Sequence, residues 1–150
     1  KFFHPVGSRE SPWKPFGGAR VALEAKDAFV NDRSPAVASL LSGGGIAQRG
    51  LTLRKGRALV GRIWLKGPAP VQVRLGGRTI ATLRPGAAWK KYPLRAVPDA
   101  DSADAALEIV AAAKGTFRVG AVSLMPADNV QGFRADTLRE LRALASPLYR

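Results

Sequence analysis

The sequence predicts a mainly β protein: an antiparallel, jelly-roll-like β-sandwich with one C-terminal α-helix. Three observations support this fold class. Apolar and polar residues alternate with period two between residues 19 and 125, as in strands that bury one face. Turn-forming residues interrupt this alternation about every ten residues, which is typical of sandwiches. After Pro126 the apolar spacing becomes helical.

The β-rich part divides at its turn signals. Residues 1–18 are rich in proline and glycine and are expected to be irregular. Gly76-Gly77 separates two alternating runs and predicts a two-residue hairpin. The expected strands are 19–25, 36–41, 45–53, 57–66, 70–75, 78–83, 88–96, 105–111 and 116–125.

The last segment, residues 126–150, is expected to hold one helix and the start of a strand. Phe133, Leu138 and Leu141 recur at helical spacing, which predicts a helix over 133–145. Pro147 ends this helix, and an apolar strand begins after it.

Composition excludes several kinds of chemistry. The chain has no cysteine and one histidine, so no disulfide, thiolate nucleophile or Cys/His metal site is expected, and no motif calls for a cofactor. No apolar run approaches the roughly 20 residues of a membrane-spanning helix. The net charge of +13 suggests polyanionic partners. However, the cations are dispersed and form no run longer than a pair, which favours a generally basic surface over a dedicated nucleic-acid site.

The carboxylates give no clear catalytic site. Asp99, Asp101 and Asp104 cluster in one polar loop. A solvated turn explains this cluster better than catalysis, and its spacing matches calcium loops only weakly. Gly43, Gly44 and Gly45 lack the following lysine of a phosphate-binding loop.

Carbohydrate binding is a better match to the aromatic residues. In the run 57–66, alternation places Trp64 on one face with Arg62 and Lys66. A sugar ring can stack on an indole while neighbouring cations donate to its hydroxyls. The alternative is that another element covers Trp64. Trp89 and Tyr92 are further candidates, although packing explains a tryptophan near a strand start better than ligand binding does. Gln48 and Arg49 are polar within an expected strand, and one of them is expected to point inward.

Several segments resemble one enzyme family. They are KFFHPV (1–6), SPW (11–13), GIAQRGL (45–51) and, most specifically, VGAVSLMPADNVQGFRAD (119–136). The chain resembles the inserted, non-catalytic region of α-L-arabinofuranosidases of glycoside hydrolase family fifty-one. The likeness is weaker in 70–100, where the turn at Gly76-Gly77 is shorter than the family's usual segment.

The resemblance implies a parent enzyme with a TIM-barrel catalytic domain. Residues 1–18 would be an irregular linker from a preceding barrel strand, 19–125 a carbohydrate-binding-like sandwich, and 126–150 the returning helix and strand start of a truncated barrel. Arg150 would match a substrate-binding arginine of that barrel. The family's catalytic glutamates match no residue of this chain, so the segment alone is expected to be inactive.

The implied partners are an arabinose-containing oligo- or polysaccharide and the rest of the barrel. Two alternatives remain at the level of the sequence. One is a structural insert that shapes the cleft or an oligomer contact without binding sugar. The other, less favoured, is a basic nucleic-acid-binding module. No membrane partner is expected, and the sequence leaves open a bacterial cytoplasmic or secreted location.

Overall fold

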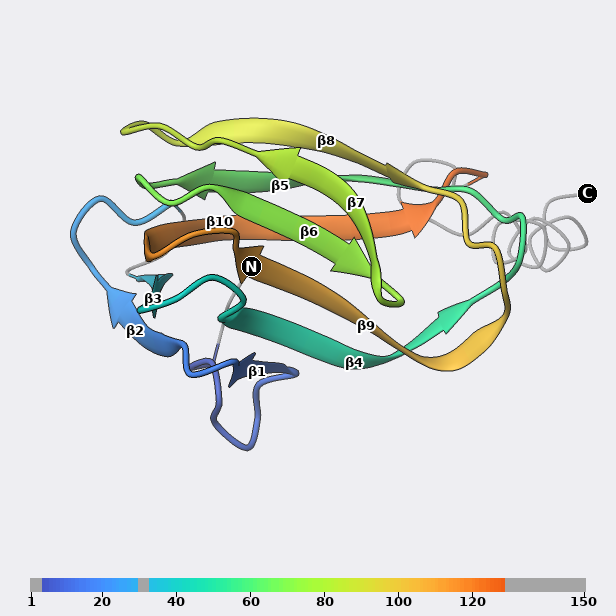
Figure 1. The fold of residues 1–150 in the computed structure, drawn as a ribbon, viewed down its shortest axis with the longest axis horizontal. Coiled ribbons are helices and arrows are strands. Elements are labelled where there is room, and N and C mark those ends of the chain that lie inside the picture. Colours follow the sequence, from blue (N-terminus) through green and yellow to red (C-terminus); the bar gives the residue numbers. More distant parts are fainter. Residues whose placement is uncertain (1–3, 30–32, 129–150) are drawn as a thin grey trace, which may run out of the picture.

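A computed structural model describes residues 4–29 and 33–128 of the chain. These residues form two five-stranded antiparallel sheets that pack face to face (Figure 1). The first, named here the β4/β9 sheet, has the order β1-β4-β9-β6-β7, and the second, the β5/β10 sheet, has the order β2-β3-β10-β5-β8. The strands are β1 Trp13–Phe16, β2 Arg20–Glu24, β3 Ser34–Ser39, β4 Gly45–Leu53, β5 Leu59–Lys66, β6 Val71–Leu75, β7 Arg78–Leu83, β8 Lys90–Ala96, β9 Ser102–Ala111 and β10 Gly115–Pro126.

The core lies between the two sheets and is built by the alternation seen in the sequence. Ile46 and Ile109 of the β4/β9 sheet and Ile63 and Phe117 of the β5/β10 sheet are all fully buried. Successive side chains of a strand point to opposite faces, so the residues next in sequence to these four lie on the outer faces of the sheets. The prediction of an antiparallel β-sandwich is therefore confirmed.

One strand was missed. Residues 1–18 were expected to be irregular, but β1 pairs with β4, with Trp13 opposite Gln48. The prolines that argued against a strand are tolerated because β1 lies at the edge of its sheet. Trp13 is only 6% exposed and joins the hydrophobic core. The sandwich therefore begins before residue 19.

The Gly76-Gly77 hairpin is confirmed. β6 and β7 pair in antiparallel register with Leu75 opposite Arg78. Gly76 and Gly77 have φ angles of 58° and 82°. Two successive positive φ angles are what a tight type I′ turn requires, and glycine adopts them without a Cβ clash.

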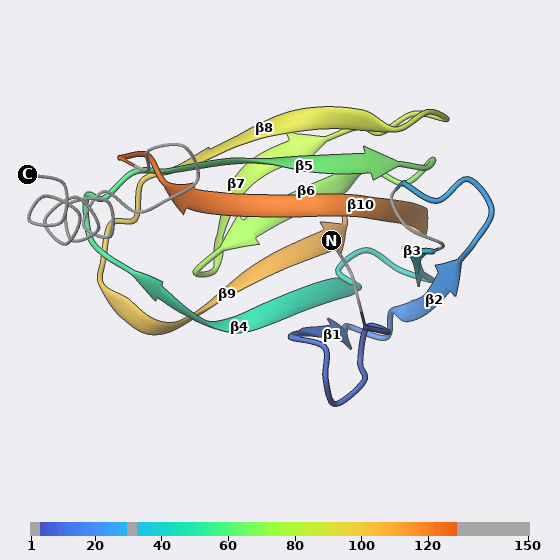
Figure 2. The same cartoon turned by 180° about the vertical axis from the view of Figure 1, so that it is seen from behind.

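A bulge at Gly120 divides β10 into two halves. The register with β5 shifts between Val119 and Ala121. As a result Phe117 and Val119 face the core in the first half, whereas Val122 and Leu124 pack against it in the second. The inserted residue thus keeps the apolar side chains on one face along the whole strand. Figure 2 shows β10 running beside β5 across its sheet.

The predicted helix over 133–145 and the strand start at 148–150 lie outside the described residues, as does Arg150. All regular elements within residues 4–29 and 33–128 are strands. Accordingly, this part of the chain contains no helix that could span a membrane.

Candidate carbohydrate-binding surface

The sugar-binding candidates Arg62 and Trp64 lie on the outer face of the β5/β10 sheet. They alternate with Ile63 and Leu65, which are fully buried on the inner face. The strand register places Pro93 of β8 and Ser123 of β10 beside Arg62.

The sequence analysis left open whether another element covers Trp64, and the structure shows that one does. Phe29, from the loop between β2 and β3, lies with its ring centroid 4.8 Å from that of Trp64 at an interplanar angle of 37°. The same phenyl ring is 5.3 Å from Trp89. Trp64 and Trp89 are each half-buried. Phe29, Trp64 and Trp89 are called here the aromatic cluster.

The aromatic cluster is held by hydrogen bonds to the loop. The Trp89 indole Nε1 donates to the carbonyl oxygen of Asp27 at 2.9 Å. The amide of Phe29 donates to Ser34 Oγ at 2.8 Å, and Ser34 is itself buried. Asp27 has a φ of 54°, a left-handed conformation that aspartate tolerates better than most residues. Residues 25–29, called here the covering loop, are thereby fixed over the sheet.

Arg118 anchors the covering loop from below. Its side chain is nearly buried, at 10% exposure. Nη1 donates to the carbonyl of Lys26 at 2.7 Å, and Nη2 donates to the carbonyl of Glu24 at 3.3 Å. Its Nε lies 3.9 Å from the Glu24 carboxylate, and its guanidinium lies 5.6 Å from the Trp89 ring centroid. Arg118 therefore donates to one carbonyl of the covering loop and to one at the end of β2, and it packs against the aromatic cluster.

An ion pair completes this end of the face. Lys66 Nζ donates to the carboxylate of Asp27 and also lies 5.7 Å from the Trp89 ring centroid. The hydrogen bond and positive charge of Lys66 lower the pKa of the Asp27 carboxyl, although the carboxyl itself is exposed. Asp27 thus holds Trp89 through its backbone and Lys66 through its side chain.

Arg62 is placed differently. It is exposed, and it makes no hydrogen bond or ion pair with any residue that the structure describes. Its guanidinium is therefore free to donate to a ligand. Of the sequence candidates on this face, Arg62 has the open surroundings expected of a binding residue.

Tyr92 is partly buried on the inner face of its sheet. It lies opposite Ile63 in the β5–β8 register and packs against the hydrophobic core. Its hydroxyl donates to the carbonyl of Arg84 at 3.2 Å. Tyr92 therefore faces away from the surface that carries Arg62 and Trp64.

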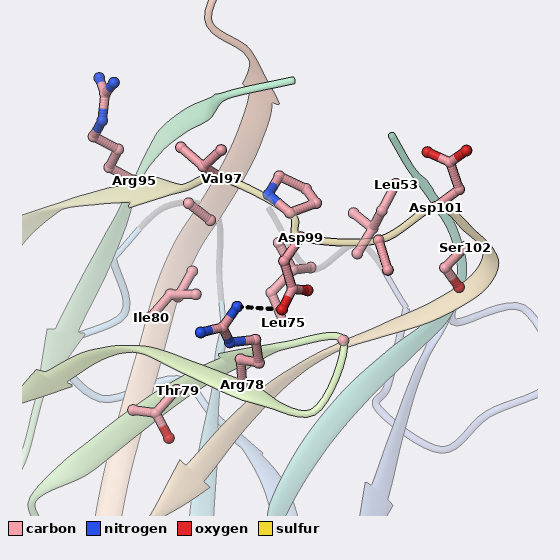
Figure 3. Close-up of a pocket in the computed structure, with 14 residues that line it drawn as sticks. Leu53, Leu75, Arg78, Thr79, Ile80, Arg95, Val97, Asp99, Asp101 and Ser102 are labelled. Atoms are coloured by element: carbon pink, nitrogen blue, oxygen red, sulfur yellow. Dashed lines mark hydrogen bonds and ion pairs between the residues drawn. The ribbon is translucent and has the colours of Figure 1, made fainter. Parts of the chain in front are cut away.

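A pocket of about 410 Å³ lies between β7 and the chain that leads from β8 into β9 (Figure 3). Its apolar wall includes Leu75 and Ile80. Arg78 and Asp99 form an exposed ion pair across it at 2.7 Å, while Arg95 extends away from this pair (Figure 3). The pocket therefore presents charges that already compensate each other.

A larger cleft of about 720 Å³ opens between the sheets beside the second half of β10. Leu51, Leu59 and Leu124 contribute to its apolar lining. Gln48 also lines it, because it shares the inner face with Trp13, whereas Arg49 is exposed. The expectation that one of these two polar residues points inward is thus confirmed for Gln48.

The aspartate cluster does not converge on one point. Asp101 accepts a hydrogen bond from the amide of Lys55 at 2.7 Å, and Asp104 accepts one from the amide of Gly50 at 3.1 Å. Asp99 pairs with Arg78. Each carboxylate thus holds a different loop or strand segment, as expected of a structural turn.

Sequence reasoning missed Phe29 and Arg118. Phe29 stands alone in a polar loop with no periodicity to assign it a partner. The available signal was Gly120, which interrupts the alternation of β10. A Cβ on Gly120 would lie only 2.7 Å from Phe29 Cβ, so the absence of a side chain there makes room for the phenyl ring.

Comparison with solved structures identifies the fold. The chain is similar to the CBM22-1 xylan-binding domain of Paenibacillus barcinonensis Xyn10C, with a TM-score of 0.61, 15% identity, and coverage of 76% of this chain and 85% of that one. It is also similar to the C-terminal family 22 carbohydrate-binding module of Clostridium thermocellum Xyn10B, with a TM-score of 0.59, 15% identity, and coverage of 86% and 96%.

Other matches place the same sandwich in larger proteins. The CBM22-1–GH10 modules of Clostridium thermocellum Xyn10B, complexed with xylohexaose, match with a TM-score of 0.64 at 13% identity, over 77% of this chain and 26% of that one. The enzymatically active domain of a bacteriophage CBA120 tailspike protein also matches, with a TM-score of 0.59 at 15% identity, over 81% and 20%. At these identities the likeness shows the fold alone: the chain has the β-sandwich fold of carbohydrate-binding modules.

No family profile matches the sequence, and no curated protein matches it.

Proposed function

We propose that the chain is a non-catalytic carbohydrate-binding module. The observation that carries the proposal is the sandwich fold, shared along most of the chain with one module described as xylan-binding and with another described as a family 22 carbohydrate-binding module. The exposed cations on a regular sheet face supply hydrogen-bond donors for hydroxyl groups. The catalytic carboxylates of a glycosidase belong, in this proposal, to another part of the parent enzyme.

We further propose that the parent is an α-L-arabinofuranosidase-type glycoside hydrolase and that the ligand is an arabinose-containing polysaccharide. The support is the resemblance of residues 119–136 to that family's inserted region. In this proposal residues 1–18 lead in from a barrel strand, although β1 within them already belongs to the sandwich. Arg150 would act at the substrate site of the barrel.

Arg62 is the leading candidate for the sugar contact, with Trp64 beside it. Phe29 leaves Trp64 half-buried, so stacking on the indole would be limited to its uncovered part. Ser123, opposite Arg62, adds a hydroxyl that can donate or accept. Trp89 and Tyr92 are weaker candidates, because Trp89 is bound to the covering loop and Tyr92 faces the core.

Affinity electrophoresis in arabinoxylan, arabinan and unsubstituted xylan tests the proposal. We expect retardation in at least one arabinose-bearing gel, with a single-site affinity near millimolar, or about −4 kcal/mol. Arg62→Ala should reduce the retardation, whereas Arg49→Ala, an exposed arginine of the other sheet, should not. Unretarded migration in every gel would contradict carbohydrate binding.

A structural insert is the second candidate, and the covered state of Trp64 favours it. Under this alternative the sandwich shapes the cleft of the parent enzyme and binds no sugar itself. Deleting the sandwich from the full enzyme would then change the kinetics on a small aryl arabinofuranoside. If the sandwich only binds polysaccharide, such a deletion should affect polymer binding and leave this small substrate unaffected.

A further inference from the structure

The outer face of the β5/β10 sheet has two ends that differ in charge balance. At the end near the covering loop, Lys66 and Arg118 are each paired with a carboxylate, those of Asp27 and Glu24. Outside these ion pairs, the face carries three exposed cations without ion-pair partners among the described residues; one lies opposite Trp64, at the border of the packed end, and the other two lie nearer the opposite end. These three are Arg62, Lys91 and Arg95, called here the basic strip.

The strand register brings the basic strip together. Arg62 lies opposite Pro93 on β8, so that Lys91 and Arg95 are its two diagonal neighbours on the same face. Diagonal neighbours in an antiparallel pair have Cα atoms about 7–8 Å apart, within reach of long side chains. Like charges at this separation repel, and a bound anion relieves that repulsion.

Protection of the sheet edge accounts for only part of this arrangement. β8 is the edge strand of its sheet, and lysine or arginine on an edge discourages pairing with other chains. That explains Lys91 and Arg95. It does not explain Arg62, because β5 lies between β10 and β8 and presents no free edge.

We infer that the basic strip binds acidic polysaccharide, through the carboxylates of uronic acid residues. This inference rests on the proposed carbohydrate-binding function and names the ligand class. Arginine presents a planar fork that matches a carboxylate, and the Ser123 hydroxyl beside Arg62 suits a sugar hydroxyl. Ionic contacts of this kind do not require an exposed aromatic ring for stacking. They are therefore compatible with this surface, where Trp64 and Trp89 pack against Phe29.

Nucleic acid is the competing polyanion. Single-stranded nucleic acids are held largely by stacking of bases on exposed aromatic rings, and the aromatic rings on this face are packed in the aromatic cluster. Duplex recognition places a helix or a β-ribbon in a groove, whereas the basic strip lies on the outer face of a sheet, across β5 and the edge strand β8. The observations therefore favour the acidic glycan.

Affinity measurements against polygalacturonate, neutral arabinoxylan and duplex DNA test the inference. We expect the protein to bind polygalacturonate at least tenfold more tightly than neutral arabinoxylan at low salt, a difference of about 1.4 kcal/mol. This preference should shrink as salt rises from about 0.01 M to 0.15 M, because the Debye length falls from about 30 Å to 8 Å.

The key variant is Arg62→Ala/Arg95→Ala, which should weaken polygalacturonate binding about tenfold. The matched control is Arg49→Ala/Lys114→Ala, which removes the same charge at exposed positions away from the strip and should change binding less than twofold. Circular dichroism and urea midpoints confirm that both variants fold.

Each contrary result points to a different failure. If the protein binds the acidic and neutral glycans equally, or if the two double variants lose the same affinity, the basic strip is not the binding site for acidic polysaccharide. Either result would leave the proposed carbohydrate binding intact. Absence of binding to either glycan would overturn the proposed function as well. If the protein binds duplex DNA more tightly than polygalacturonate at the same salt concentration, the ligand of the basic strip is nucleic acid and not an acidic glycan.

Discussion

At one end of the outer face of the β5/β10 sheet, Trp64, Lys66 and Arg118 lie beneath the loop that carries Phe29. At the other end, Arg62 lies open to solvent on the same strand as Trp64. Both ends combine cations with a regular strand surface. At the first end, carboxylates, loop carbonyls and a phenyl ring engage Lys66, Arg118 and Trp64, whereas none of the residues that the structure describes forms a hydrogen bond or ion pair with Arg62. Residue type alone therefore does not distinguish a packing residue from a binding residue; the neighbouring elements do.

Substitutions in the aromatic cluster, at the packed end of the face, are expected to reduce the stability of the fold most. Trp64→Ala should destabilise the fold by about 2–3 kcal/mol, less than for a fully buried tryptophan because the ring is half-buried. Arg62→Ala, two residues away, should stay within about 0.5 kcal/mol. Urea denaturation of both variants checks this, and equal losses would mean that the two ends do not differ.

Arg118→Met should have the next largest effect. The change keeps an apolar stem but leaves the carbonyls of Glu24 and Lys26 without their donor, at a cost of about 2 kcal/mol. Arg62→Met is the matched control on the open end. Faster hydrogen exchange of the Phe29 amide should accompany the loss, and unchanged exchange would show that Arg118 does not hold the loop.

Gly120→Ala tests the fit of Phe29 against β10. The added methyl would meet the Phe29 side chain, so we expect a loss of about 1 kcal/mol and a change in tryptophan fluorescence as the ring shifts. Gly86→Ala is a suitable control, because a Cβ there meets no neighbouring atom within 4 Å. A stable variant with unchanged emission would contradict the close contact.

The Asp27–Lys66 pair should give a small, acid-dependent effect. The pKa of Asp27 is lowered in the folded state, mainly by the hydrogen bond from Lys66. Its stabilising effect is therefore complete above the ordinary aspartate pKa and is lost as the pH falls through the lower, folded-state value. Asp27→Asn should weaken the acid dependence of the urea midpoint below about pH 4. If the urea midpoints of the unsubstituted protein and of Asp27→Asn depend on pH in the same way, the Asp27–Lys66 pair does not contribute to stability.

The sequence could predict the sandwich because alternation is a local signal, and it recurs in several strands, as in β5 and β6. It placed Arg62 and Trp64 on one face for the same reason. It could not assign Phe29 to Trp64, since that contact joins a loop to a strand more than thirty residues away. β1 was missed because Pro12 and Pro15 obscure a strand that an edge position tolerates.

The division of this face into a packed end and a binding end is tested most directly by mapping a glycan onto it. Amide chemical shifts can be followed while polygalacturonate oligosaccharides are titrated into the protein. We predict perturbations centred on Arg62, Lys91 and Arg95, little change at Phe29 and Asp27, and none on the outer face of the β4/β9 sheet. Perturbations centred on the pocket of Arg78 and Asp99, or on the β4/β9 sheet, would contradict the account.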